Sequence, residues 1–153
     1  YPLGYAVVLS LYNYRLTDIQ CALCLSQLPR LPRWIVRRQR IAAAYTEAFA
    51  GTPIRPLGTR GGVSHGYHLF VARVPDRDRV FTALREVGIG VNLHYIPVHF
   101  HPFYRQRFGT GEGLCPVAEA AYGEILSLPI FPAMSDADVR RVSDEVRRQV
   151  GRG

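Results

Sequence analysis

The stretch NYRLTDIQCALCLSQL, Asn13 to Leu28, joins a polar loop to the start of a helix. Thr17 suits the position that caps a helix, and Gln20 follows three residues later, which is the spacing of a capping box. Apolar residues then recur at helical spacing and predict a helix that ends near Leu28. Asn13 and Arg15 place amide and guanidinium donors beside this helix N-terminus, where proteins often bind anions such as phosphate.

Working outward, apolar periodicity and breaker residues divide the rest of the chain into helices and strands. Helices are expected at 32–50, 76–87, 116–126 and after 135, and strands at 67–74 and 91–95. Asp76 is expected to cap the second of these helices and Gly88 to end it, and Ser135 with Asp138 is expected to cap the last helix. Residues 51–66 and 96–114 are expected to be loops. A strand–helix–strand core with flanking helices predicts an α+β fold.

Length and composition narrow the class of protein. A chain of 153 residues with 48% hydrophobic residues suits one folded domain. The longest apolar run near the start, Ala6 to Leu11, is too short to span a membrane, so no membrane partner is expected. Three cysteines without a disulfide-rich spacing favour a reducing compartment, and we expect a cytoplasmic protein.

The charge of the chain comes from arginine alone. The formal net charge is +7, and all 19 basic residues are Arg, with no Lys. A basic chain can bind nucleic acid. Here the arginines are scattered, and groups such as Arg37, Arg38 and Arg40 are typical of a solvated helix face, so no nucleic-acid partner is expected.

Three segments carry a resemblance to a known family. They are the opening stretch, GIGVNLHYIPVHFHPFYRQRFG (Gly88 to Gly109) and CPVAEAAYGEILSLPIFPAMSDADVRRV (Cys115 to Val142). In this order and spacing they resemble the DegT/DnrJ/StrS family of sugar aminotransferases, pyridoxal-phosphate (PLP) enzymes that aminate nucleotide-linked keto sugars. The HYIPVH stretch most resembles the branch that makes the amino-sugar precursor of pseudaminic acid.

The resemblance implies a fold and a division of the chain. The expected fold is the small C-terminal domain of the aspartate-aminotransferase (type I PLP) fold, with a small, mainly antiparallel sheet flanked by helices. Residues 1–50 would form inter-domain helices with a loop for the cofactor phosphate, and residues 51–153 the α+β domain. Because a PLP aminotransferase holds its cofactor through a lysine amine, the chain is expected to be a segment of a longer enzyme or a truncated relative.

The resemblance also implies site residues, none of them catalytic. Asn13 is the first candidate and Arg15 the second for holding the PLP phosphate of a neighbouring subunit in a homodimer. His94, Tyr95 and His99 are the candidates for contacts with a UDP-linked 4-keto sugar, and the amino donor would be an amino acid such as glutamate. His94 and Tyr95 are expected to end a strand and to point to opposite faces.

Two other hypotheses stay open on the sequence. The chain could be a non-catalytic remnant that acts only as a partner. It could also be a metal-binding module, because three histidines in the loop and Cys115 are zinc-type ligands, although their spacing fits no zinc-finger pattern. The pair Cys21 and Cys24 forms a C-x-x-C inside a predicted amphipathic helix, which indicates core packing.

Overall fold

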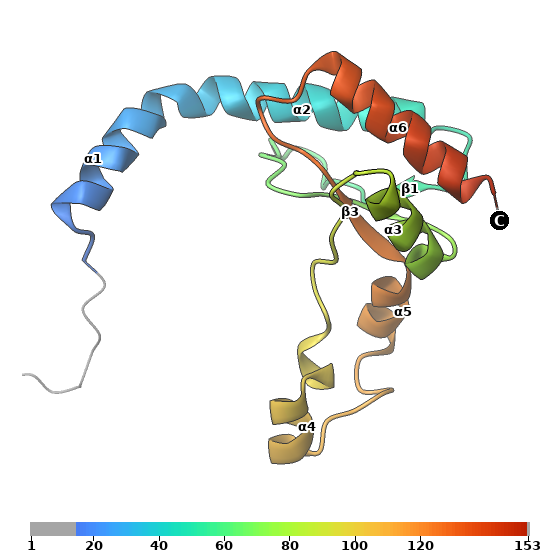
Figure 1. Cartoon of the computed structure of the whole chain (residues 1–153). Coiled ribbons are helices and arrows are strands. Elements are labelled where there is room, and N and C mark those ends of the chain that lie inside the picture. Colours follow the sequence, from blue (N-terminus) through green and yellow to red (C-terminus); the bar gives the residue numbers. More distant parts are fainter. Residues whose placement is uncertain (1–14, 153) are drawn as a thin grey trace, which may run out of the picture. The chain divides into compact units, whose positions relative to one another are not determined.

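The computed structural model describes residues 15–152, and Figure 1 shows the order of their helices and strands. The chain divides into two compact units between Pro32 and Arg33. Asn13 lies outside the described residues, so the loop predicted around it is not seen. The functional division predicted at residue 50 stays a prediction.

The described part of the first unit is helical. Helix α1 (Asp18–Gln27) is followed directly by the 3₁₀ turn η1 (Leu28–Arg30). The predicted capping box is confirmed: the Gln20 amide donates to the Thr17 hydroxyl at 3.3 Å, and the Thr17 amide donates to the Gln20 side-chain oxygen at 2.8 Å. No residue of α1 is buried, and Cys21 and Cys24 are exposed. The prediction that these cysteines pack in a core is therefore wrong for the described chain.

Helix α2 (Leu31–Ala48) supplies one side of the hydrophobic core. Its first turn contains Pro32, which is tolerated there because the first amides of a helix have no partner within it. Tyr45 is fully buried, with its ring centre 5.0 Å from that of Phe70 and 6.0 Å from that of Phe49. The Tyr45 hydroxyl donates to the backbone oxygen of Pro129 at 2.9 Å, which ties the helix to the segment after the sheet.

The sheet has three antiparallel strands in the order β1-β2-β3, as predicted for the fold class. They are β1 (Arg55–Pro56), β2 (Phe70–Arg73) and β3 (Ile125–Leu128). β1 lies where a loop was predicted. β3 was not predicted, and its first two residues were wrongly assigned to the end of the helix expected at 116–126; that helix, α5 (Pro116–Glu124), ends just before β3.

The strand predicted at 91–95 does not form. Only Asn92 pairs with β3, through an isolated bridge to Ser127 in which the two residues exchange bonds of 3.1 and 2.8 Å. The loop predicted at 96–114 is also wrong in part. It contains the 3₁₀ turn η2 (Val98–Phe100) and helix α4 (Pro102–Phe108).

Two helices, α3 (Arg77–Glu86) and α6 (Asp136–Val150), pack together in the second unit. Asp76 directly precedes α3 as predicted, but it makes no side-chain cap, because its carboxylate instead accepts a bond from Arg79 Nε at 2.5 Å. Gly88 follows α3 with a φ of +77°, which confirms its predicted role at the helix end.

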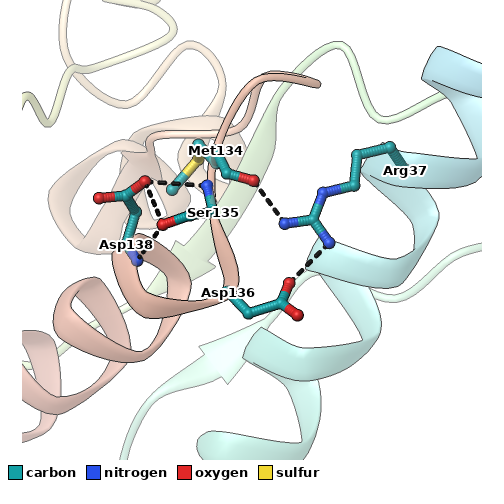
Figure 2. Close-up of polar contacts among 5 residues, drawn as sticks. All are labelled: Arg37, Met134, Ser135, Asp136 and Asp138. Carbon is teal, nitrogen blue, oxygen red and sulfur yellow. Dashed lines mark hydrogen bonds and ion pairs between the residues drawn. The ribbon is translucent and has the colours of Figure 1, made fainter.

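The start of α6 is held from two directions (Figure 2). The predicted cap is confirmed: the Asp138 amide donates to Ser135 Oγ at 3.1 Å, and the Ser135 amide donates to Asp138 Oδ2 at 2.8 Å. The bonds from the Ser135 hydroxyl and amide hold the pKa of Asp138 below its usual value. From α2, Arg37 donates to Asp136 Oδ1 at 2.7 Å and to the backbone oxygen of Met134.

Candidate functional site

The candidate site lies around a projecting segment of the second unit, residues 96–114, which we call the arm. Figure 1 shows α4 within the arm standing away from the sheet. Several of its apolar side chains are exposed, namely Val98, Phe103, Phe108 and Leu114. The arm begins next to His94 and Tyr95 and returns to the chain at the start of α5.

His94 is held against the sheet by a side-chain bond. Its Nδ1 lies 2.8 Å from the hydroxyl oxygen of Ser127, which is buried in the middle of β3. The ring of His94 meets the ring of Tyr95 edge to face, with 4.7 Å between their centres. Tyr95 itself is 71% exposed. The two residues thus differ in exposure, but the predicted reason, alternation at a strand end, is wrong because no strand forms there.

His99 is buried and faces α5 rather than solvent. Its Nε2 lies 2.8 Å from Glu119 Oε1, and its backbone oxygen accepts a bond from Thr110 Oγ1 at 2.9 Å. The amides of Gly113 and Cys115 also donate to the Glu119 carboxylate, at 2.9 and 3.0 Å. These two backbone bonds, with a smaller contribution from His99, hold the pKa of Glu119 below its usual value.

The exposed part of this arrangement presents the phenol of Tyr95 beside the imidazole of His94. A phenol such as that of Tyr95 can donate or accept hydrogen bonds, and imidazole rings do both through their two nitrogens. Such groups suit the hydroxyls of a sugar or the oxygens of a diphosphate. The structure brings His94 and Tyr95 together and sets His99 apart in η2, where it faces α5, so the three predicted residues lie in two environments.

Of the two predicted cofactor residues, the structure describes Arg15 alone. Arg15 is exposed and precedes the capping box of α1 by two residues. A guanidinium group can bond two oxygens of a phosphate at once. The chain supplies no lysine, so its own residues suit only the phosphate end of PLP and not its aldehyde.

A second concave surface lies between α2 and the segment before α6. It has a volume of about 550 Å³ and is lined by Arg33, Trp34, Arg37, Arg38 and residues 131–133. Arg37 is committed to the cap of α6, as described above. The residues that line this hollow are not those of the candidate site.

The metal-binding alternative receives no support from the described residues. Among residues 15–152, no three His, Cys, Asp or Glu side chains lie close enough together to hold a metal ion. Within the same range, none of the helices has the length and apolar character needed to cross a membrane.

Two polar residues of the site were not foreseen, Ser127 and Glu119. Ser127 lies in β3, a strand that was not predicted, just after the predicted end of a helix at 126. Glu119 follows Pro116 in the first turn of α5, and an acidic residue in a first turn is a common helix-start signal. An acidic residue there predicts where α5 begins, but it does not predict that Glu119 bonds His99.

The chain is similar to known proteins over nearly its whole length. Residues 5–147 match the DegT/DnrJ/EryC1/StrS aminotransferase family. The spore coat polysaccharide biosynthesis protein SpsC of Bacillus subtilis (strain 168) is 41% identical over 145 residues, which cover 89% of this chain and 37% of SpsC.

Solved structures give the same result. The PLP-form of Spr1654 from Streptococcus pneumoniae, described as a sugar aminotransferase, matches with a TM-score of 0.89 and 28% identity, over 98% of this chain and 40% of that one. DesV of S. venezuelae matches with a TM-score of 0.89 and 33% identity, over 100% and 42%. The chain therefore spans less than half the length of these relatives, and the predicted aminotransferase fold is confirmed for this part.

A third solved structure bears on the branch of the family. PseC of Helicobacter pylori, an aminotransferase involved in the biosynthesis of pseudoaminic acid, matches with a TM-score of 0.86 and 26% identity, over 99% of this chain and 42% of PseC.

Proposed function

This chain belongs to the DegT/DnrJ/EryC1/StrS aminotransferase family, and from this premise we propose that it is the C-terminal part of a PLP-dependent sugar aminotransferase. The complete enzyme would transfer an amino group from an amino acid, with glutamate as the expected donor, to a 4-keto sugar linked to UDP. The observation that carries the proposal is the match over residues 5–147, together with a relative solved in both its PLP-form and its PMP-form.

The composition of the chain supports a division of labour in this enzyme. When bound, PLP supplies an aldehyde that accepts the donor's amino group. The enzyme requires a lysine amine to hold PLP. Because all 19 basic residues here are Arg, that lysine would belong to polypeptide outside this chain. The chain would contribute phosphate and sugar contacts.

We assign the phosphate contacts to Asn13 and Arg15. In a homodimer, the loop that carries them would reach the cofactor of the neighbouring subunit. The capping box behind the loop supports this assignment, because it fixes the direction in which the chain enters α1.

We assign the sugar contacts to His94, Tyr95 and His99. The exposed phenol of Tyr95, beside the imidazole of His94, supports contacts with sugar or diphosphate oxygens. His99 would act from its buried position at the start of the arm. The branch we propose is the one that leads to pseudaminic acid, on the HYIPVH stretch and the likeness to PseC.

The test uses the longest gene product that contains this chain. It is incubated with PLP, glutamate and UDP-linked 4-keto sugars that differ in configuration at C5, and the amino sugar and 2-oxoglutarate are measured. Formation of both products in equal amounts is expected. An enzyme that consumes glutamate but aminates none of these sugars would contradict the proposed substrate, and one that never binds PLP would contradict the proposed function.

The cofactor assignment has its own test in the same protein. The Asn13→Ala variant should lose PLP faster during dialysis than the wild type, because one phosphate contact is missing. Unchanged retention of PLP would remove Asn13 from the cofactor site. We further propose a cytoplasmic location, which is consistent with the three free cysteines.

A further inference from the structure

Tyr95 lies in a short segment that is held at both ends. On one side, the ring of His94 bonds the hydroxyl of Ser127 in β3 at 2.8 Å. On the other side, His99 bonds Glu119 in α5 at 2.8 Å. Between these two points the chain is exposed at Tyr95 and Ile96, so the position of the Tyr95 phenol depends on the two side-chain bonds.

The bond at Glu119 does more than hold one histidine. Its carboxylate also accepts bonds from the amides of Gly113 and Cys115, at 2.9 and 3.0 Å. His99 belongs to the beginning of the arm, Gly113 belongs to its end, and Cys115 directly follows it. A single side chain on α5 therefore joins the two ends of the arm.

The hydrogen bonds between Glu119 and its donors are largely shielded from water. The side chains of His99 and Glu119 are only 9% and 14% exposed. Hydrogen bonds to a charged acceptor are about twice as strong as bonds between neutral groups. The lowered pKa of Glu119 keeps the carboxylate charged at neutral pH, so all three donors face an ionised partner.

A ring contact also holds the arm at its base: the ring of Phe100 meets that of Tyr122 on α5, with 6.5 Å between their centres. Thr110 adds one bond to the His99 backbone, whereas Phe103 and Phe108 of α4 are 65% and 64% exposed and do not belong to the described core. Loss of the Glu119 carboxylate would remove the side-chain bonds that tie both ends of the arm to α5, and only the Thr110 bond and the Phe100 ring contact would remain of the contacts described above.

We propose that Glu119 is a positioning residue for the sugar substrate: by joining His99 to the end of the arm, it fixes Tyr95 where the sugar binds. This inference rests on the proposed function. It assigns no contact between Glu119 and the substrate, since the carboxylate is already occupied by its three donors.

The test compares Glu119→Ala, Glu119→Gln and the control Glu112→Ala in the longest gene product. Glu112 is an exposed carboxylate in the arm, so its removal changes the charge equally without touching the cluster. Glu119→Ala should raise the KM for the UDP-linked keto sugar at least about tenfold, because a small displacement of a binding group is costly. Glu119→Gln keeps one acceptor oxygen and should restore part of the loss.

A second readout separates positioning from general damage. The half-reaction with glutamate alone, followed by the change in PLP absorbance, does not involve the sugar and should keep its rate in Glu119→Ala. If the sugar KM stays unchanged, or if both half-reactions decline together, the positioning role is wrong.

The cluster can also be tested without any substrate. Hydrogen exchange should show faster exchange of the Gly113 and Cys115 amides in Glu119→Ala, with Glu112→Ala like the wild type. If these amides exchange no faster, the inference fails even when the enzyme is active. A wild-type enzyme that aminates no sugar would instead refute the proposed function, and the exchange result would then stand separately.

Discussion

Replacement of Tyr45 tests how the second unit is held together. This side chain is fully buried between α2 and the sheet, packs against Phe49 and Phe70, and bonds the backbone of Pro129 at 2.9 Å. Tyr45→Phe removes only the hydroxyl bond, whereas Tyr45→Ala removes the ring as well. The two variants thus separate the polar contribution from the packing contribution.

The expected magnitudes follow from these contacts. Loss of the hydroxyl bond should lower the free energy of unfolding by about 1 kcal/mol, the usual value for one intramolecular hydrogen bond. Removal of a fully buried aromatic ring costs about 3–5 kcal/mol, because the ring loses its contacts and leaves a cavity. A domain of this size has a total stability of about 5–15 kcal/mol, so Tyr45→Ala should be close to unfolding at 37 °C.

The assay is urea unfolding of the whole chain, followed by circular dichroism. With a slope of about 2 kcal/mol per molar urea, Tyr45→Phe should shift the midpoint by about 0.5 M and Tyr45→Ala by about three times as much or more. Tyr95→Ala is the matched control for stability, because the same ring is removed from a position that is 71% exposed. If Tyr45→Ala and Tyr95→Ala unfold at the same urea concentration, the assignment of Tyr45 to the core is wrong.

Three further predictions concern stability. Ser135→Ala should lower the free energy of unfolding by about 1 kcal/mol in the same urea assay, because the α6 cap is lost; a midpoint like that of the wild type would argue against the cap. Gly88→Ala should cost about 1–2 kcal/mol because of the left-handed backbone there, whereas Gly58→Ala, which has open space and no positive φ, should cost less; equal effects would contradict this. The pKa values of Asp138 and Glu119 are lowered in the folded chain, so their contribution is present above the ordinary values of 3.8 and 4.5 and is lost as the pH falls through the folded values. The melting temperature should therefore decline below about pH 4, and a constant value from pH 7 to 3 would count against this linkage.

Features that depend on neighbouring residues could be predicted from the sequence. The capping boxes at Thr17 and Ser135 involve contacts over three residues, and the structure has both. Gly88 was also predicted correctly, because a helix end that needs a positive φ favours glycine regardless of the rest of the fold. Asp76 is the exception, since a nearby Arg79 competes for its carboxylate.

Features that depend on distant partners were missed. Ile125–Leu128 is a short apolar run next to a helix, and such a run fits a helix or a buried strand equally well. Its pairing with Phe70 and the residues after it decides for a strand. Val91 and its neighbours have strand-like composition, yet only Asn92 finds a partner.

The candidate site follows the same rule. The likeness to a family predicted His94, Tyr95 and His99 as site residues, but it did not predict the side chains that hold them in place. The bond from His99 to Glu119 joins residues twenty positions apart, and the bond from His94 to Ser127 spans thirty-three. No periodic pattern in the sequence links either pair, so these contacts could only be found in three dimensions.

The shortest strand has a consequence for how this polypeptide meets other chains. β1 consists of Arg55 and Pro56 and lies at one end of the sheet order. A proline has no amide hydrogen to offer an incoming strand, and a charged neighbour disfavours such an approach. The β1 edge of the sheet therefore disfavours the addition of a strand from another chain. It also disfavours the fibrous aggregation that can follow from such addition.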